Sequence, residues 1–169
     1  MTDKKTNMKN TVRFDIYSVG KFVIAALIVI YVAGLFIFTS GSTKSFEEVA
    51  GPVDGMINKR RMVKAEDRDI KKLYGINAGD YEGVLCYVAK NNLSAEEVIV
   101  VKVKETNQIK DVKDAIYHRI DKRKEDFKGY APEEEKYLDD AIVSIRGKFV
   151  FMAVGPDGEQ QKDTFDNKL

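Results

Sequence analysis

Cysteine and histidine are scarce in this chain of 169 residues, which contains one of each. A single cysteine cannot form an intramolecular disulfide, so packing alone must hold the fold together. The one cysteine, Cys86, also lies far beyond the apolar run near the N-terminus. A lipoprotein is therefore excluded, because acylation needs a cysteine directly after such a run.

The motifs that usually carry chemistry are missing as well. The sequence has no glycine loop for phosphate, no spaced set of zinc ligands and no serine at a nucleophile elbow. Internal repeats and Gly/Ser tracts are also lacking. We therefore predict no catalytic, cofactor-binding or metal-ligating residue and no cofactor, the binding residues stay unknown, and the sequence leans against an enzyme.

Strong charge of one sign is also lacking. Residues 40–169 hold 23 basic and 25 acidic residues, which gives this part a net charge of −2. A nucleic-acid-binding domain normally carries a clear excess of positive charge. We therefore expect no nucleic-acid partner, and a protein or cell-envelope partner fits better; the sequence leaves the oligomeric state open.

A long apolar run near the N-terminus is the most prominent feature that is present. Residues 22–38 contain no charged side chain, and as a helix they would extend roughly 26 Å, close to the thickness of a bilayer core. Residues 1–21 hold five basic and two acidic residues, which favours a cytoplasmic N-terminus by the positive-inside rule. The sequence thus predicts a single-pass bacterial cell-membrane protein whose C-terminal domain is extracellular.

The fate of this run has two alternatives. The small residues Ser40-Gly41-Ser42 offer a signal-peptide cleavage site after about Ser42, but the run is long and ends in the bulky residues 36–38, which favours a retained anchor. The predicted organisation is a cytoplasmic basic segment over 1–21, a transmembrane helix over 22–39, a short linker over 40–44 and an extracytoplasmic domain over 45–169.

The hydrophobic periodicity of residues 45–169 predicts an α+β domain. Ser45 and Glu48 form a capping-box pattern at the start of a helix, which Pro52 should kink or break. Further helices are predicted over 66–74, 107–128 and 132–146, with strands over 81–89, 98–103 and 149–154 and a short last helix near the C-terminus.

The fold class is therefore a three-stranded sheet packed by helices, with the strand order left open. In the strand over 149–154 we expect both faces to be covered. Phe149, Phe151 and Val154 are placed on one face, and Val150 and Met152 on the other.

Five groups of residues are candidate sites, and each has a plainer structural explanation. His118 fits a solvated position and Cys86 a buried small apolar residue with no cation to activate it. The acidic cluster of helix 132–146 suits the positive end of a helix dipole and a solvated face, since it lacks the spacing of a calcium loop. This cluster consists of Glu133, Glu134, Glu135, Asp139 and Asp140.

The remaining two groups are basic. Lys59, Arg60, Arg61 and Lys64 suit a solvated turn better than a contact with lipid headgroups. Arg119 and Arg123 lie beside the apolar stripe of the long helix. We expect their stems to cover the core while their guanidinium groups pair with a carboxylate at its rim.

Short segments of residues 45–169 resemble a known family in their order and spacing. They are residues 73–76, 81–83, 94–98, 101–102, 127–132 and 147–150, together with Arg119, Phe165 and Leu169. They resemble bacterial membrane-bound or lipid-anchored proteins that share a domain of unknown function of the 4358 type. Many such proteins use a lipoprotein signal, whereas this chain has an apolar helix. The resemblance implies no activity and no catalytic residues.

Three functions stay open at this point. The first is a non-enzymatic module that binds a partner protein or an envelope component, which the missing catalytic motifs favour. The second is a structural subunit of a membrane-associated assembly, by analogy of fold alone. The third is an enzyme that acts on envelope polymers through a pair of carboxylates.

Overall fold

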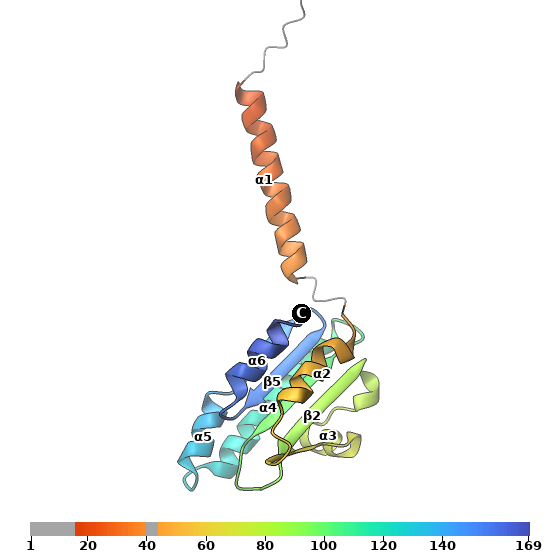
Figure 1. The fold of residues 1–169 in the computed structure, drawn as a ribbon. Coiled ribbons are helices and arrows are strands. Elements are labelled where there is room, and N and C mark those ends of the chain that lie inside the picture. Colours follow the sequence, from red (N-terminus) through yellow and green to blue (C-terminus); the bar gives the residue numbers. More distant parts are fainter. Residues whose placement is uncertain (1–15, 40–43) are drawn as a thin grey trace, which may run out of the picture. The chain divides into compact units, whose positions relative to one another are not determined.

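The computed structural model describes residues 16–39 and 44–169 (Figure 1). Within the first range, side chains are described for residues 20–34. The chain divides into two compact units, one that extends to Phe38 and one that runs from Thr39 to Leu169. The two units are described separately.

Helix α1, Ile16–Thr39, belongs to the first unit as far as Phe38, and its described apolar side chains are mostly exposed. No helix among the described residues is long and apolar enough to cross a membrane. This finding corrects the transmembrane helix predicted over residues 22–39, since a span needs about 20 consecutive apolar residues.

Several predictions on this part of the chain are not tested. Residues 1–15 of the basic segment, residues 40–43 of the linker and the cleavage site at Ser40–Ser42 lie outside the described residues. The extracellular location of residues 45–169 and the predicted partners also stay predictions.

The second unit is built on a five-stranded antiparallel sheet with the order β1-β2-β3-β5-β4 (Figure 1). Its strands are β1 Met62–Lys64, β2 Gly83–Ala89, β3 Glu97–Lys102, β4 Ile142–Arg146 and β5 Phe149–Val154. The α+β packing and the interior position of β5 agree with the sequence. The predicted three-stranded sheet is wrong, because both edge strands, β1 and β4, were missed.

The two missed strands have different causes. β1 has three residues, too few to show an alternating pattern. β4 was read as the end of a helix over 132–146, but α5 stops at Asp139 and Ile142, Val143 and Ile145 continue as a strand. Such β-branched residues favour strands. Gly147, with φ of 55°, then forms the tight connection from β4 to β5.

Six helices complete the described residues: α1, α2 Phe46–Met56, α3 Asp67–Tyr74, α4 Gln108–Phe127, α5 Pro132–Asp139 and α6 Gly158–Asp166, with a short 3₁₀ helix, η1, at Ala78–Asp80. The capping box is confirmed, since the Ser45 hydroxyl accepts from Glu48 N and the Glu48 carboxylate accepts from Ser45 N. The predicted break at Pro52 is wrong. α2 runs through Pro52 because Val49 and Val53, both fully buried, hold it against the sheet.

Helices cover both faces of the sheet (Figure 1). On one face, which we call the phenylalanine face, α2 and α6 pack against alternate strand residues such as Phe149 and Phe151. On the other face, the aliphatic face, α3, α4 and α5 pack against residues such as Ile99 and Met152. The predicted place of Val154 is wrong, because it belongs to the aliphatic face with Met152, as alternation along a strand requires.

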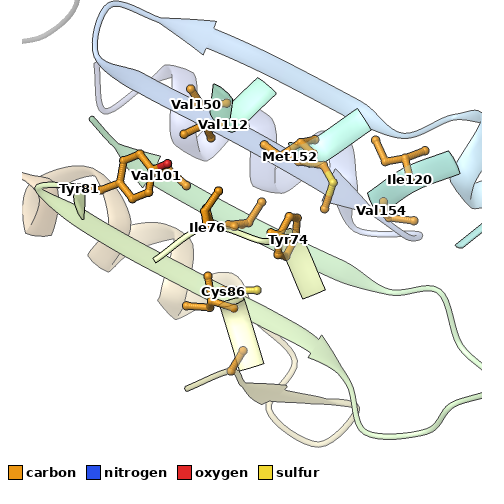
Figure 2. Packing of buried hydrophobic residues seen from close by; sticks show 14 of the residues in the cluster. Tyr74, Ile76, Tyr81, Cys86, Val101, Val112, Ile120, Val150, Met152 and Val154 are labelled. Atoms are coloured by element: carbon orange, nitrogen blue, oxygen red, sulfur yellow. The ribbon is translucent and has the colours of Figure 1, made fainter. Parts of the chain in front are cut away.

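The aliphatic face has a tightly filled centre. Figure 2 shows Cys86 on β2, Val101 on β3 and Met152 on β5 facing side chains of α3 and α4. Tyr74, the last residue of α3, lies in the same layer and is buried. Its hydroxyl group brings a polar atom into this core, and its partner lies at the candidate site.

Candidate functional site

A depression of two adjoining hollows lies at the β1 end of the aliphatic face. The inner hollow has a volume of about 220 Å³ and reaches from Val88 to α4. The outer hollow has a volume of about 460 Å³ and lies between β1 and α3. Both are lined by Leu73 of α3 and Val88 of β2, so they adjoin each other, and we call the pair the depression.

A buried ion pair forms part of the inner hollow. Arg119 of α4 holds Glu97 of β3 with two nitrogens, and Nη2 lies 2.8 Å and Nε 3.1 Å from the carboxylate oxygens. The side chains of Arg119 and Glu97 are 11% and 5% exposed. The Tyr74 hydroxyl donates a third hydrogen bond to the same carboxylate. Glu97 is therefore fully engaged by Arg119 and Tyr74.

This arrangement explains how a charged residue stays in the core. Removing a carboxylate from water costs several kcal/mol unless a partner with good geometry compensates. A forked guanidinium provides that geometry. Burial raises the pKa of Tyr74 well above its usual value, and the Glu97 charge raises it further, so the hydroxyl remains a donor. The predicted pairing of Arg119 with a carboxylate is confirmed, although the pair is buried rather than at the rim.

Arg123 lies one turn along α4 from Arg119 and also lines the inner hollow. Its Nη2 donates to the Ser94 carbonyl at 3.0 Å, and its guanidinium lies 4.4 Å from the centre of the Phe127 ring. Asp126 pairs with it at 3.3 Å. Its buried Nε has no hydrogen-bond partner within the described part of the chain. Arg123 thus connects α4 to the loop that follows β2.

Glu96 is the second carboxylate of the inner hollow, and it too has an arginine partner. Arg61 lies 3.1 Å from Glu96 and 2.7 Å from Asp157, so it connects the start of β1 to the start of β3 and to the loop before α6. Burial raises the pKa of Glu96 in spite of this cation. Both carboxylates of the hollow are therefore held by arginines.

The outer hollow combines an apolar floor with a basic rim. Val63 lies directly opposite Val88 in the β1–β2 ladder, and together with Leu73 they supply the apolar surface. Arg68 and Lys72, one turn apart on α3, are exposed at the rim.

Two acidic residues also line this hollow, but one of them serves the helix. Asp69 accepts a hydrogen bond from Glu66 N at 3.3 Å at the start of α3. In contrast, Arg68 and Lys72 form no ion pair with any residue in 16–39 or 44–169. The Lys64 side chain lies beside Tyr87 on the phenylalanine face, where it interacts electrostatically with Asp54. The rim therefore offers free positive charge.

A family profile described as a domain of unknown function, DUF4358, matches residues 56–155. The matched range contains the whole sheet and both hollows. The chain belongs to the DUF4358 family. The resemblance noted in the sequence is thus confirmed for the domain, and the family's description names no activity. No curated protein and no solved structure matches the chain.

Two candidates from the sequence lie outside the depression of this DUF4358 domain. His118 is exposed on α4. Cys86 is fully buried, as predicted, and burial raises the pKa of its thiol strongly. A thiol that stays protonated is a poor nucleophile. Its role in the DUF4358 domain is packing on the aliphatic face.

The acidic cluster of α5 is only partly a solvated surface. Glu134 Oε2 accepts from the buried Ala95 N at 2.6 Å, which joins α5 to the segment before β3. Asp139 pairs with Lys124 of α4 at 2.9 Å. Within 16–39 and 44–169, no group of three or more His, Cys, Asp or Glu side chains is placed to hold a metal ion. The prediction of an exposed Glu134 is wrong, because this carboxylate caps a loop N–H.

The basic turn before β1 is more structured than predicted. Lys59 pairs with Asp54 at 2.7 Å, and Arg61 holds Glu96. Lys64 lines the outer hollow.

Some residues that line the depression were not predicted as site residues, namely Val63, Leu73, Arg68, Lys72 and Glu97. Glu97 had a usable signal, because it is the one acidic residue at the start of an otherwise β-branched strand. The others look like ordinary surface residues in the sequence.

Proposed function

We propose that the DUF4358 domain is a non-enzymatic binding module that takes a partner protein or a cell-envelope component in the depression. The observation that carries the proposal is the outer hollow. Val63, Val88 and Leu73 present apolar surface there, and Arg68 and Lys72 lie at its rim without an ion pair among the described residues. Apolar surface with a polar rim is the usual composition of a recognition site.

The chemistry of the inner hollow supports binding over catalysis. General acid–base work on a polymer normally uses two carboxylates that face the substrate. Here Glu97 is engaged by Arg119 and Tyr74, and Glu96 is paired with Arg61. These groups are arranged to hold β3, α3 and α4 together beneath a surface.

Site-specific crosslinking in the native host tests the proposal. A photoreactive phenylalanine analogue replaces Val63 in the full-length chain, and Tyr117 on α4 carries the same analogue in the control. Both residues are 45% exposed, and Tyr117 lines neither hollow. We expect a light-dependent adduct from position 63 and none from position 117.

The nature of the adduct separates the two partner classes. A protein adduct gives a discrete band that protease removes, whereas an envelope polymer gives a smear that glycan-degrading enzymes remove. Equal adducts from both positions, or none from position 63, would reject the depression as a binding site.

A further inference from the structure

We infer that the β1 edge and the outer hollow bind an acidic, extended segment of a partner protein, which adds a strand beside β1. This inference rests on the proposed function and names the chemistry of the partner. It is carried by three independent features of the same place. These are an open strand edge, an apolar floor and a rim of unpaired cations.

The first feature is the open backbone edge. β1 is the terminal strand of the sheet. On the side of β2, Lys90 N donates to the Arg61 carbonyl and Ala65 N donates to the Cys86 carbonyl, both at 2.9 Å or less. Bonded pairs recur at every second residue of an antiparallel ladder. Lys64 therefore directs its N–H and C=O away from β2, and neither group has a hydrogen-bond partner among the described residues.

The second feature is the floor beneath that edge. Val63, which is 45% exposed, and Val88 lie side by side in the ladder, and Leu73 of α3 closes the floor. An added strand would place every second side chain on this apolar surface, because side chains alternate between the faces of a sheet. The hollow's volume of about 460 Å³ can accommodate such side chains.

The third feature is charge. Arg68 and Lys72 are four residues apart and therefore lie on the same side of α3, above the floor. Both cations are without an ion pair among the described residues, and Asp69, one of the two acidic residues of the hollow, already accepts from Glu66 N. An incoming carboxylate can therefore pair with Arg68 and Lys72. The bound segment should therefore carry Asp or Glu between its apolar residues.

The open edge favours a peptide over an anionic envelope polymer. A polyphosphate chain could match the cations, but it has no N–H groups to pair with a strand and no apolar side chains for Val63 and Leu73. Strand addition uses backbone bonds for affinity and pockets under alternate side chains for specificity. All of these are present at β1.

A peptide library gives a direct test with the purified full-length chain, kept in mild detergent because α1 exposes apolar side chains. The library contains nine-residue peptides with Val, Ile, Leu or Thr at even positions and equal amounts of Asp, Glu, Lys, Arg, Asn and Gln at odd positions. We expect bound peptides to be enriched in Asp and Glu at least about threefold over Lys and Arg. Binding of the best peptide should weaken as salt rises, because exposed charges are screened.

Matched variants locate the site. Lys72→Glu reverses a charge that lines the hollow, and Lys71→Glu reverses its neighbour on α3, which does not line it. Lys72→Glu combined with Arg68→Glu should weaken the best peptide about tenfold or more. Lys71→Glu should change its affinity less than about twofold, and circular dichroism reports whether each variant is folded.

Two further probes separate the possible ligands. The best peptide is resynthesised with N-methyl groups at alternate residues, which keeps its charge and removes its strand-pairing N–H groups. Poly(glycerol phosphate) serves as the anionic polymer. We expect the methylated peptide to lose at least about tenfold in affinity and the polymer to bind more weakly than the unmethylated peptide.

Several outcomes would overturn the inference. They are a library without acidic enrichment, equal effects of Lys71→Glu and Lys72→Glu, unchanged binding of the methylated peptide, and tighter binding of the polymer. If position 63 still gives a specific adduct in cells, any of these results rejects the acidic segment alone and leaves the binding module standing. If position 63 gives no adduct either, both proposals fail.

Discussion

The two faces of the sheet use the same strands for different purposes. On the phenylalanine face, Phe151 and Phe149 pack with Phe165 of α6, and the Phe151 and Phe165 rings are stacked with centres 4.8 Å apart. On the aliphatic face, smaller side chains surround the Tyr74–Glu97–Arg119 cluster, and the depression opens beside it. One face is closed by aromatic packing, and the other contains the ionic groups and the hollows.

The neighbours Glu97 and Val98 show how the sheet keeps these purposes apart. They are adjacent in β3, but alternation sends Glu97 to the aliphatic face and Val98 to the phenylalanine face. Stability and recognition can therefore change independently across a single sheet. The following substitutions test this separation, beginning with the largest expected effect.

Phe151→Ala should cause the greatest loss of stability. The side chain is fully buried and stacked on Phe165, so truncation leaves a cavity between β5 and α6. Such a change typically costs about 3–5 kcal/mol. Without a disulfide to restrict the unfolded chain, the domain should be close to unfolding at physiological temperature. Urea denaturation of the full-length chain, followed by circular dichroism, measures the effect.

Leu93→Ala is the control for this substitution. Leu93 is 65% exposed in the loop after β2, so its truncation should change the free energy of unfolding by less than about 0.5 kcal/mol. Similar losses for Phe151→Ala and Leu93→Ala would show that β5 is not the centre of the core. Peptide binding at the β1 edge should survive Phe151→Ala wherever the variant remains folded.

Arg119→Met should cause the second-largest loss of stability. This substitution acts on the aliphatic face. The substitution leaves the Glu97 carboxylate buried with only the Tyr74 hydroxyl as a partner. Removing one member of a buried pair typically costs about 3–5 kcal/mol, and the 11% exposure of Arg119 places this case at the lower end. Urea denaturation again provides the measurement.

The double variant Arg119→Met with Glu97→Gln separates the charge from the packing. Gln can still accept from Tyr74 and carries no charge that needs a cation. We expect the double variant to recover at least about 1 kcal/mol relative to Arg119→Met alone. A double variant as unstable as the sum of the single ones would mean that the pair contributes little beyond the packing of each side chain.

The central elements were predictable from the sequence because their patterns are long or strongly apolar. β2, β3 and β5 are runs of apolar residues bounded by turns, and α3 stops before Gly75, whose φ of 74° suits glycine. The edges of the sheet were not predictable in the same way. β1 is too short for periodicity, and β4 has Ile142, Val143 and Ile145 at positions that also fit a helix face.

The depression was harder to predict because tertiary structure assembles it. Its floor combines Val63 from β1, Val88 from β2 and Leu73 from α3, and no local pattern joins them. The pairing of Arg119 with a carboxylate was predictable from its place beside an apolar stripe. The identity of Glu97 as its partner required the register of β3, which places that residue under α4.

Glu134→Ala should lower the free energy of unfolding by a smaller amount. Glu134 lies at the border of the aliphatic face. Glu134 accepts from the N–H of Ala95, a residue that is 1% exposed, so its loss leaves a buried donor without a partner. The expected cost is about 1–2 kcal/mol. Glu134→Gln keeps an acceptor and should cost less, and Glu133→Ala, on the exposed side of α5, should cost less than about 0.5 kcal/mol. Equal values for Glu133→Ala and Glu134→Ala would place Glu134 back on the solvated surface.

Asp54→Asn should lower the free energy of unfolding by the smallest amount, and this change should depend on pH. Asp54 lies at the border of the phenylalanine face. Lys59 and the Tyr87 hydroxyl donate to the Asp54 carboxylate at 2.7 and 2.6 Å and lower its pKa below the usual 3.8. A carboxylate whose pKa is lower in the folded state stabilises the protein above the unfolded-state pKa and loses this contribution as the pH falls through the folded-state value.

The Asp54 carboxylate is partly exposed, so we expect the free energy of unfolding of wild type to exceed that of Asp54→Asn by about 1 kcal/mol near neutral pH. Urea denaturation between about pH 2 and 7 should show this difference shrinking below about pH 4. The control is Asp121→Asn, because Asp121 is exposed on α4 and its carboxylate accepts no hydrogen bond among the described residues. A constant difference between wild type and Asp54→Asn across this range would mean that the Tyr87 contact, rather than the charge, provides the stability.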